Sequence, residues 1–281
     1  MKRSLCLSLV AFLLCGAPAL AAEFAGFAGF ARKNLVAWCI VPFDATKRGP
    51  EARAKMLKKL GITRSAFDWR AEHVSSFEAE IQAYAANGID FFAFWGAHEE
   101  AFSLFQKYKL TPQIWQTAPS PEGETDAIKV SRAVEALLPL VEKTRSLGCP
   151  LGLYNHGHWG GEPKNLVAVC LALREKYAAK HVGIVYNFHH AHEQLPDIED
   201  SLKLMTPYLL CLNLNGMNDK PEPKILQIGK GKHDARLLEM VAQLGYDGPI
   251  GIIDHQSERD TEECLRENIE GLEAWQRAVR R

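Results

Sequence analysis

The chain has 281 residues, of which 47% are hydrophobic and 24% charged, and its formal net charge at pH 7 is −1. A chain with this net charge lacks the excess of positive charge that attracts nucleic acids, so we expect no nucleic-acid partner. No apolar run is long enough to cross a bilayer, so we also expect no membrane partner once the leader described next has been removed.

Residues 1–22 resemble a secretory signal peptide. Lys2 and Arg3 form a charged start, residues 5–14 are apolar, and residues 19–21 (Ala-Leu-Ala) form a small-residue cleavage site. Cleavage removes two positive charges, which changes the net charge from −1 to −3. We therefore expect an exported protein, periplasmic or extracellular.

Five cysteines follow the leader, and most of them lie inside apolar runs. Their odd number and their surroundings indicate small buried hydrophobic residues, although one disulfide bond stays open in an oxidising compartment. The positions are Cys39, Cys149, Cys170, Cys211 and Cys264.

The expected domain organisation is a signal peptide at 1–22, a tether at 23–33 and one folded domain at 34–281. In that domain, strand-like and helix-like segments alternate eight times. The expected strands cover residues 35–41, 62–67, 89–95, 113–115, 151–154, 182–186, 208–214 and 250–253. The expected helices cover residues 51–60, 77–86, 99–108, 127–147, 165–177, 197–205, 234–244 and 261–279.

The strands are almost entirely apolar, as expected for parallel strands that are buried on both faces. Eight consecutive strand–helix units predict an α/β fold with a single (β/α)₈ TIM barrel. An open, doubly wound sheet is the alternative. The sequence after the first strand, PFDATKRGP, lacks the glycine pattern of a dinucleotide site, so we expect no nucleotide cofactor.

In such barrels the functional side chains follow the strands. Two strand exits, YNHGH at 154–158 and NFHHAH at 187–192, are rich in polar residues. Aromatic rings interleaved with polar groups suit a sugar ring, which needs partners for its hydroxyl groups and a flat surface for its C–H face. The predicted substrate-binding residues are Trp69, Trp95, Asn155, Asn187, Asn213 and Asn215.

The predicted catalytic residues are Arg70, Glu72, His73 and His189. Glu72 and His73 could transfer protons while Arg70 stabilises an enolate oxygen, and His189 could act as a general acid or base. The alternative for the group after the second strand is a charge set at a helix N-terminus. The turn at 44–50, which contains Lys47 and Arg48, is either a solvated turn or an anion-binding turn.

The segment 225–252, ILQIGKGKHDARLLEMVAQLGYDGPIGI, resembles a signature of the xylose isomerase-like TIM barrels, a superfamily of sugar isomerases and epimerases. The exits of the fifth and sixth strands are also similar to that family. The matching positions of the signature are Gly229, Gly231, Asp234, Gly245, Tyr246 and Gly248.

The resemblance implies one divalent metal held by Glu, Asp, His and Glu on the last four strands. Here Tyr154, Asn187, Asn213 and Ile253 fall at or near these places. A histidine-rich replacement for Zn²⁺, Mn²⁺ or Co²⁺ is the open alternative to a metal-free site. Its predicted ligands are His156, His190, Asp254 and His255. Asp254 would need a bulge, because it is one residue out of phase.

The resemblance implies an enzyme that abstracts a proton next to a sugar carbonyl. Isomerisation, epimerisation and elimination from a keto-glycoside all begin with that step. The second hypothesis is a non-catalytic carbohydrate-binding barrel that has lost the family metal. The histidine cluster favours the enzyme, whereas the missing carboxylates favour the binding protein.

Overall fold

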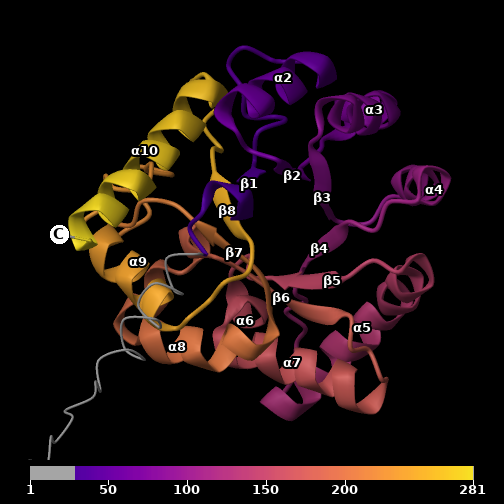
Figure 1. Ribbon diagram of the computed structural model, residues 1–281. Coiled ribbons are helices and arrows are strands. Elements are labelled where there is room, and N and C mark those ends of the chain that lie inside the picture. The colour runs from indigo at the N-terminus through magenta and orange to yellow at the C-terminus, as the bar shows by residue number, and fades with distance from the viewer. Residues whose placement is uncertain (1–28, 281) are drawn as a thin grey trace, which may run out of the picture.

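The computed structural model describes residues 29–280, which form a closed barrel of eight parallel strands (Figure 1). Each strand pairs with its neighbours along the chain, and β8 closes the ring against β1. The predicted TIM barrel is therefore confirmed. The strands are β1 (Leu35–Trp38), β2 (Arg64–Phe67), β3 (Asp90–Trp95), β4 (Gln113–Thr117), β5 (Leu151–Tyr154), β6 (Val182–Asn187), β7 (Leu209–Leu214) and β8 (Ile250–Ile253).

The helices surround this ring and cover its outer face (Figure 1). They are α2 (Pro50–Leu60), α3 (Phe77–Asn87), α4 (Glu99–Tyr108), α5 (Asp126–Leu147), α6 (His158–Gly161), α7 (Pro163–Lys176), α8 (Ile198–Met205), α9 (Asp234–Gln243) and α10 (Thr261–Val279). Several of them end on a left-handed glycine, such as Gly88 after α3 and Gly148 after α5. Glycine adopts this conformation without a steric penalty, which explains the sharp helix ends.

Inward-facing residues of the strands fill the barrel. Large rings alternate with small side chains, so that Trp38 and Trp115 meet edge to face at 4.8 Å while Ala66 and Ala93 leave room for them. Gly251 has a similar role, because a Cβ atom there would lie 1.8 Å from the Oδ1 atom of Asn213. The barrel centre is thus a packed aromatic core rather than a pore.

The ends of several elements differ from the sequence prediction. Strand β1 ends at Trp38 instead of residue 41, because Cys39 takes a left-handed conformation with φ 59°. Short helices that the sequence pattern did not predict follow β5 and β6, namely α6, η3 (Phe188–His190) and η4 (His192–Asp197). These turns are too short to show helical periodicity, and they carry His158, His189, His190 and His192 of the two polar strand exits.

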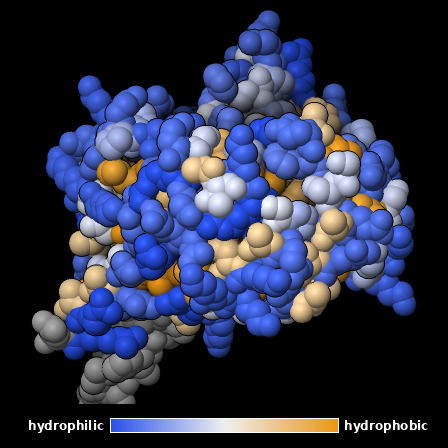
Figure 2. All heavy atoms as spheres, turned by 90° about the horizontal axis from the view of Figure 1, so that it is seen from above, coloured by the Kyte–Doolittle hydropathy of each residue, from blue (hydrophilic) through white to orange (hydrophobic). Residues whose placement is uncertain are grey.

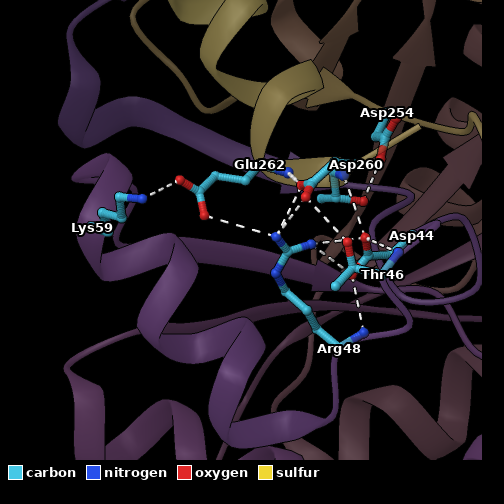
Figure 3. Close-up of polar contacts among 8 residues, drawn as sticks. Asp44, Thr46, Arg48, Lys59, Asp254, Asp260 and Glu262 are labelled. Atoms are coloured by element: carbon cyan, nitrogen blue, oxygen red, sulfur yellow. Dashed lines mark hydrogen bonds and ion pairs between the residues drawn. The ribbon is translucent and has the colours of Figure 1, made fainter.

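A network of charged groups fixes the loop after β1 (Figure 3). The Arg48 guanidinium contacts the Asp44 carboxylate at 2.8 Å and the Asp260 carboxylate at 2.9 Å, and its side chain is only 13% exposed. Both alternatives predicted for the turn at 44–50 are wrong as far as Arg48 is concerned. The Arg48 side chain forms internal ion pairs that join this loop to the N-terminus of α10.

The beginning of the described chain packs onto the barrel. Phe30 is buried, and its ring meets that of Trp275 edge to face at 5.1 Å. The predicted signal peptide at 1–22, and the part of the predicted tether before residue 29, lie outside the described residues.

The surface in Figure 2 is mostly hydrophilic, with hydrophobic residues scattered among charged ones. Within residues 29–280, no helix is both long enough and apolar enough to cross a membrane.

We predict that the ion pair between Arg53 on α2 and Glu80 on α3 is essential for stability. The two side chains are 5% and 0% exposed and lie 2.6 Å apart. Glu80→Ala leaves a buried charge without its partner, so the free energy of unfolding should fall by about 3–5 kcal/mol in urea titrations. Lys55→Ala removes the exposed Lys55–Glu51 pair and should change it by at most about 0.5 kcal/mol. Equal effects of both substitutions would contradict the prediction.

Candidate functional site

A cavity of about 230 Å³ lies at the carboxyl ends of the barrel strands. This is the end of a TIM barrel at which catalytic residues gather, since the strand–helix loops there can vary without disturbing the barrel. The cavity is lined by Trp38, Cys39, Phe43, Asp68, Arg70, Trp95, Tyr154, His156, Asn187, His189, His190, Ile225, Ile253 and His255.

The cavity brings together many of the residues predicted from the sequence. Those in its wall are Arg70, Trp95, His156, Asn187, His189, His190 and His255. The predicted residues that do not line it are Trp69, Glu72, His73, Asn155, Asn213, Asn215 and Asp254.

The inner part of the wall is a neutral hydrogen-bonded group. The Tyr154 hydroxyl oxygen accepts hydrogen bonds from Trp38 Nε1 at 3.0 Å and from Asn187 Nδ2 at 2.5 Å. The ring of Trp95 meets that of Tyr154 edge to face at 4.8 Å. Burial raises the pKa of the Tyr154 phenol far above its usual value, so the group carries no charge at neutral pH.

Asn155 acts as a brace behind the wall. Its Oδ1 atom accepts a hydrogen bond from the Asn187 backbone N–H at 2.6 Å, and its Nδ2 atom donates to the Asn187 carbonyl at 3.0 Å. The Asn187 side chain in turn accepts from the backbone N–H of His189 at 3.0 Å and so starts η3. The predicted substrate-binding role of Asn155 thus becomes a positioning role for the β6 exit.

Four histidines form one side of the cavity. The rings of His156 and His190 lie 4.5 Å apart, and those of His189 and His190 lie 4.9 Å apart. Burial, helped by the neighbouring imidazoles, lowers the pKa of His189 to about 4 and that of His190 to about 3. Burial, with Lys224 next, lowers the pKa of His255 to about 4. These rings are therefore neutral at pH 7, and each has a nitrogen that can accept a proton.

Two cationic side chains lie beside the cavity. The Lys224 Nζ atom is 3.0 Å from His255 Nε2, and the His255 ring stacks on Phe43 at 3.7 Å. The Arg70 guanidinium lies over the Phe43 ring, 5.3 Å from the ring centre. An oxygen that becomes negative during a reaction would find positive charge on this side.

The backbone is strained at the same place. Cys39 and His255 both take left-handed conformations, with φ of 59° and 68°, and both line the cavity. The His255 backbone N–H donates to the Cys39 carbonyl at 3.2 Å, which links the two residues. Such conformations are uncommon for residues other than glycine and concentrate at functional sites.

The group after β2 is arranged differently from the prediction. Glu72 is exposed and lies outside the cavity wall, and the His73 Nδ1 atom accepts a hydrogen bond from the Arg70 backbone N–H at 2.9 Å. Trp69 packs against the core, and its Nε1 atom donates to the Trp95 carbonyl. His73 therefore caps the turn η2 (Ala71–Ser76), Glu72 lies in its first turn as the alternative of a charge set predicts, and of these three residues only Arg70 reaches the cavity.

Asn213, Asn215 and Asp254 are buried away from the cavity wall. The Asn215 side chain donates to the Gly216 carbonyl at 2.8 Å, and the Asp254 carboxylate accepts from the Thr261 hydroxyl at 2.5 Å (Figure 3). Asp254 faces α10 because successive residues at a strand end point to opposite sides, and no bulge turns it inward. Ile253 and His255 line the cavity, and His255 takes a left-handed backbone conformation just after the strand.

The sequence prediction did not include Asp68 among its site residues. This residue follows β2, is 3% exposed and lies in the cavity wall. Burial raises the pKa of its carboxyl group to about 7, against a smaller opposite effect of Arg70. The position of Asp68 directly after a barrel strand indicates a site residue. The prediction instead chose Arg70, Glu72 and His73, two to five residues later in the chain.

The residues present do not fit the metal that the family resemblance implies. At the corresponding places the chain has a phenol, two amides and an alkyl group, and the Tyr154 and Asn187 side chains are already bonded to each other. Neutral amides and phenols are poor ligands for divalent ions compared with carboxylates. Within residues 29–280, no three His, Cys, Asp or Glu side chains are grouped as a metal site, because Asp254 faces away from the predicted histidine ligands.

We predict that His190 makes stability depend on pH. Its folded-state pKa is about 3 and its unfolded value about 6.5, so the unfolded chain takes up the proton first as the pH falls. The free energy of unfolding of the wild type, relative to His190→Gln, should fall by about 1–3 kcal/mol between pH 6.5 and 4, with partial exposure reducing the effect. Asp68 and Asp254, whose pKa is raised, act in the opposite direction but are present in both proteins. Urea titrations measure the difference, which should stay flat from pH 7.5 to 9; a flat profile below 6.5 would contradict the prediction.

Comparison with known proteins assigns the chain to a family. The profile described as "Xylose isomerase-like TIM barrel" matches residues 18–275. The structure is similar to a 3-keto-D-glucoside 4-epimerase from E. coli in its apo form, with 13% identity, a TM-score of 0.61 and coverage of 87% of this chain and 99% of that one. No curated protein sequence matches the chain.

Two further solved structures are similar. A D-tagatose 3-epimerase-like protein has 14% identity and a TM-score of 0.64, and the match covers 88% of this chain and 99% of that one. The IolI protein with a bound zinc atom has 12% identity and a TM-score of 0.67, with 86% and 97% covered. At these identities the likeness shows the fold, whereas the profile match covers most of the sequence. The chain belongs to the xylose isomerase-like TIM barrel family.

Proposed function

We propose that the chain is an enzyme that acts on a carbohydrate by moving a proton next to a carbonyl group. The reaction is an isomerisation, an epimerisation or an elimination from a keto-glycoside. The observation that carries the proposal is the cavity itself, which combines indole rings with neutral proton acceptors at the active end of the barrel.

The size and lining of the cavity suit one sugar ring. Its volume of about 230 Å³ is below the roughly 300–1,000 Å³ of pockets for drug-sized ligands. Trp95 offers a flat apolar surface to the C–H face of a sugar, and Asn187 and His156 offer hydrogen-bonding groups for hydroxyls. A lining of indole rings, an amide and neutral imidazoles favours a ligand with many hydroxyl groups.

The cavity also has the parts that enolate chemistry requires. Neutral imidazoles at His189 and His190 can accept or return protons, and the Arg70 guanidinium can stabilise the oxygen that becomes negative. The names of similar structures support the same reaction class. One is a 3-keto-D-glucoside 4-epimerase, another a D-psicose 3-epimerase with D-tagatose, and a third a probable 3-DHS dehydratase.

We further propose that the reaction does not depend on the family metal. Similar structures contain zinc or magnesium, but this chain has Tyr154, Asn187 and Ile253 where the resemblance implies metal ligands. The positive charge of Arg70 then stabilises the oxyanion in place of a metal ion.

The second candidate function is a carbohydrate-binding barrel without catalytic activity. The hydrogen bond between Asn187 and Tyr154 supports it, because two positions at which the resemblance implies metal ligands form a neutral pair. The two functions predict the same ligand but differ in whether the bound sugar exchanges its carbon-bound hydrogen with solvent.

The test is to mix the purified protein with D-fructose, D-tagatose and methyl 3-keto-D-glucopyranoside in D₂O. We expect NMR to show loss of the proton next to the carbonyl in at least one sugar, unchanged by a chelator. Tryptophan fluorescence should show binding, and Trp95→Ala should weaken it by about ten- to a hundredfold. Trp159→Ala, outside the cavity, serves as the control. Binding without exchange would support the second candidate, and neither binding nor exchange would refute both.

We also propose that the protein is exported, on the basis of the charged start, apolar segment and Ala-Leu-Ala site at its N-terminus. Expression of the full chain in a bacterium should give a mature protein that begins near Glu23 in the periplasmic or extracellular fraction. N-terminal sequencing identifies that end. A cytoplasmic product that begins at Met1 would contradict the proposal.

A further inference from the structure

Asp68 has a carboxylate oxygen with no partner. Its Oδ1 atom accepts a hydrogen bond from the Val41 backbone N–H at 3.3 Å, but its Oδ2 atom is buried and has no hydrogen-bond partner in the described structure. A buried polar atom without a partner lowers stability. Asp68 lines the cavity, and an unsatisfied buried carboxylate oxygen at such a place is a feature of catalytic groups.

We propose that Asp68 is the base that removes the proton from the carbon next to the carbonyl of the bound sugar, with Arg70 holding the oxygen that becomes negative. This inference rests on the proposed function and assigns its central step to a residue outside the metal set that the family resemblance implies.

The surroundings of Asp68 match this role. Burial raises the pKa of its carboxyl group to about 7, and the charges of Arg70 and Arg53 oppose the shift only in part. A base with a pKa near the working pH combines a high fraction of the active form with a strong tendency to take the proton. Cys39 lies in the same wall, but burial raises the pKa of its thiol, which therefore stays neutral.

No other carboxyl group among residues 29–280 lines the cavity. Glu72 is exposed and outside the wall, and the carboxylate of Asp254 is bonded to Thr261 on the side of α10. The histidines of the opposite wall have a lowered pKa, which makes them weaker bases than Asp68.

The step balances without a further reactant. The Asp68 carboxylate forms an O–H bond as the C–H bond breaks, and the freed electron pair forms a C=C bond while the carbonyl electrons move to oxygen. The resulting enediolate is next to the Arg70 guanidinium. In D₂O the Asp68 proton exchanges with solvent, and a deuteron returns to the carbon when the carbonyl re-forms.

The test compares Asp68→Asn with Asp90→Asn, using D-fructose, D-tagatose and methyl 3-keto-D-glucopyranoside as probes. Asp90 lies at the start of β3, at the opposite end of the barrel, and loses the same charge. Asp68→Asn should reduce the rate of hydrogen exchange by about 100-fold or more while the Kd from tryptophan fluorescence changes less than about threefold. Asp90→Asn should change neither quantity.

The pH dependence separates catalysis from a structural role. In the wild type the exchange rate of bound sugar should rise with pH through about 7, because only the ionised carboxylate accepts the proton. Asp68→Glu should restore part of the rate with a shifted midpoint, whereas the residual rate of Asp68→Asn should lack this step. Circular dichroism checks that both variants fold, and unchanged sugar binding keeps the comparison valid.

The failures can be told apart. If the wild type exchanges hydrogen and Asp68→Asn retains the rate within about threefold, the role of Asp68 is refuted but the enzyme proposal stands. If the wild type binds sugar without exchange, the binding-protein candidate replaces both. If Asp68→Asn loses binding and exchange together and Asp68→Glu restores neither, Asp68 supports the structure and is not the base.

Discussion

The alternation of side chains along eight paired strands is the constraint on which the site depends. The register places Trp38 beside Ile253 and Asn187 beside Asn213, so residues at one level of the barrel face inward together. A change of one residue along a strand sends a side chain to the helices instead of the cavity. Asp254 illustrates this, since Ile253 and His255 line the cavity and Asp254 between them is bonded to Thr261 near α10.

The same constraint explains the neutral wall at the places where the family resemblance implies metal ligands. Tyr154 and Asn187 project inward from neighbouring strands, close enough for the amide to donate to the phenol at 2.5 Å. Trp38 donates to the same oxygen from β1, so a single buried atom joins three strands. A divalent ion would have to displace bonds that are already formed, and it would gain only neutral ligands. The cavity therefore lies at the usual end of the barrel, and the chemistry possible there depends on the other residues that line it.

The fold was predictable from the sequence because each unit shows its own pattern. The apolar runs and the helical periodicities are local, and eight repeats leave few topologies. The positions of His190, His255 and Trp95 in the cavity were also predictable, since they follow from strand ends. The internal ion pairing of Arg48 and the burial of Asp68 were not, because they depend on contacts between distant segments. Arg48 pairs with Asp260, more than two hundred residues away, and the isolation of Asp68 depends on burial by the loop after β1.

The cavity shifts the pKa values of two kinds of titratable group in opposite directions. Burial disfavours charge on all of them, so it lowers the pKa of the histidines and raises that of Asp68. The result at pH 7 is a set of neutral imidazoles opposite a carboxyl group that is partly ionised, with Arg70 as a fixed positive charge beside them. Different environments for potential acids and bases are the usual basis for assigning separate roles in proton transfer. A partly ionised carboxyl group with one unsatisfied oxygen in the cavity wall supports the proposed catalytic role over binding alone.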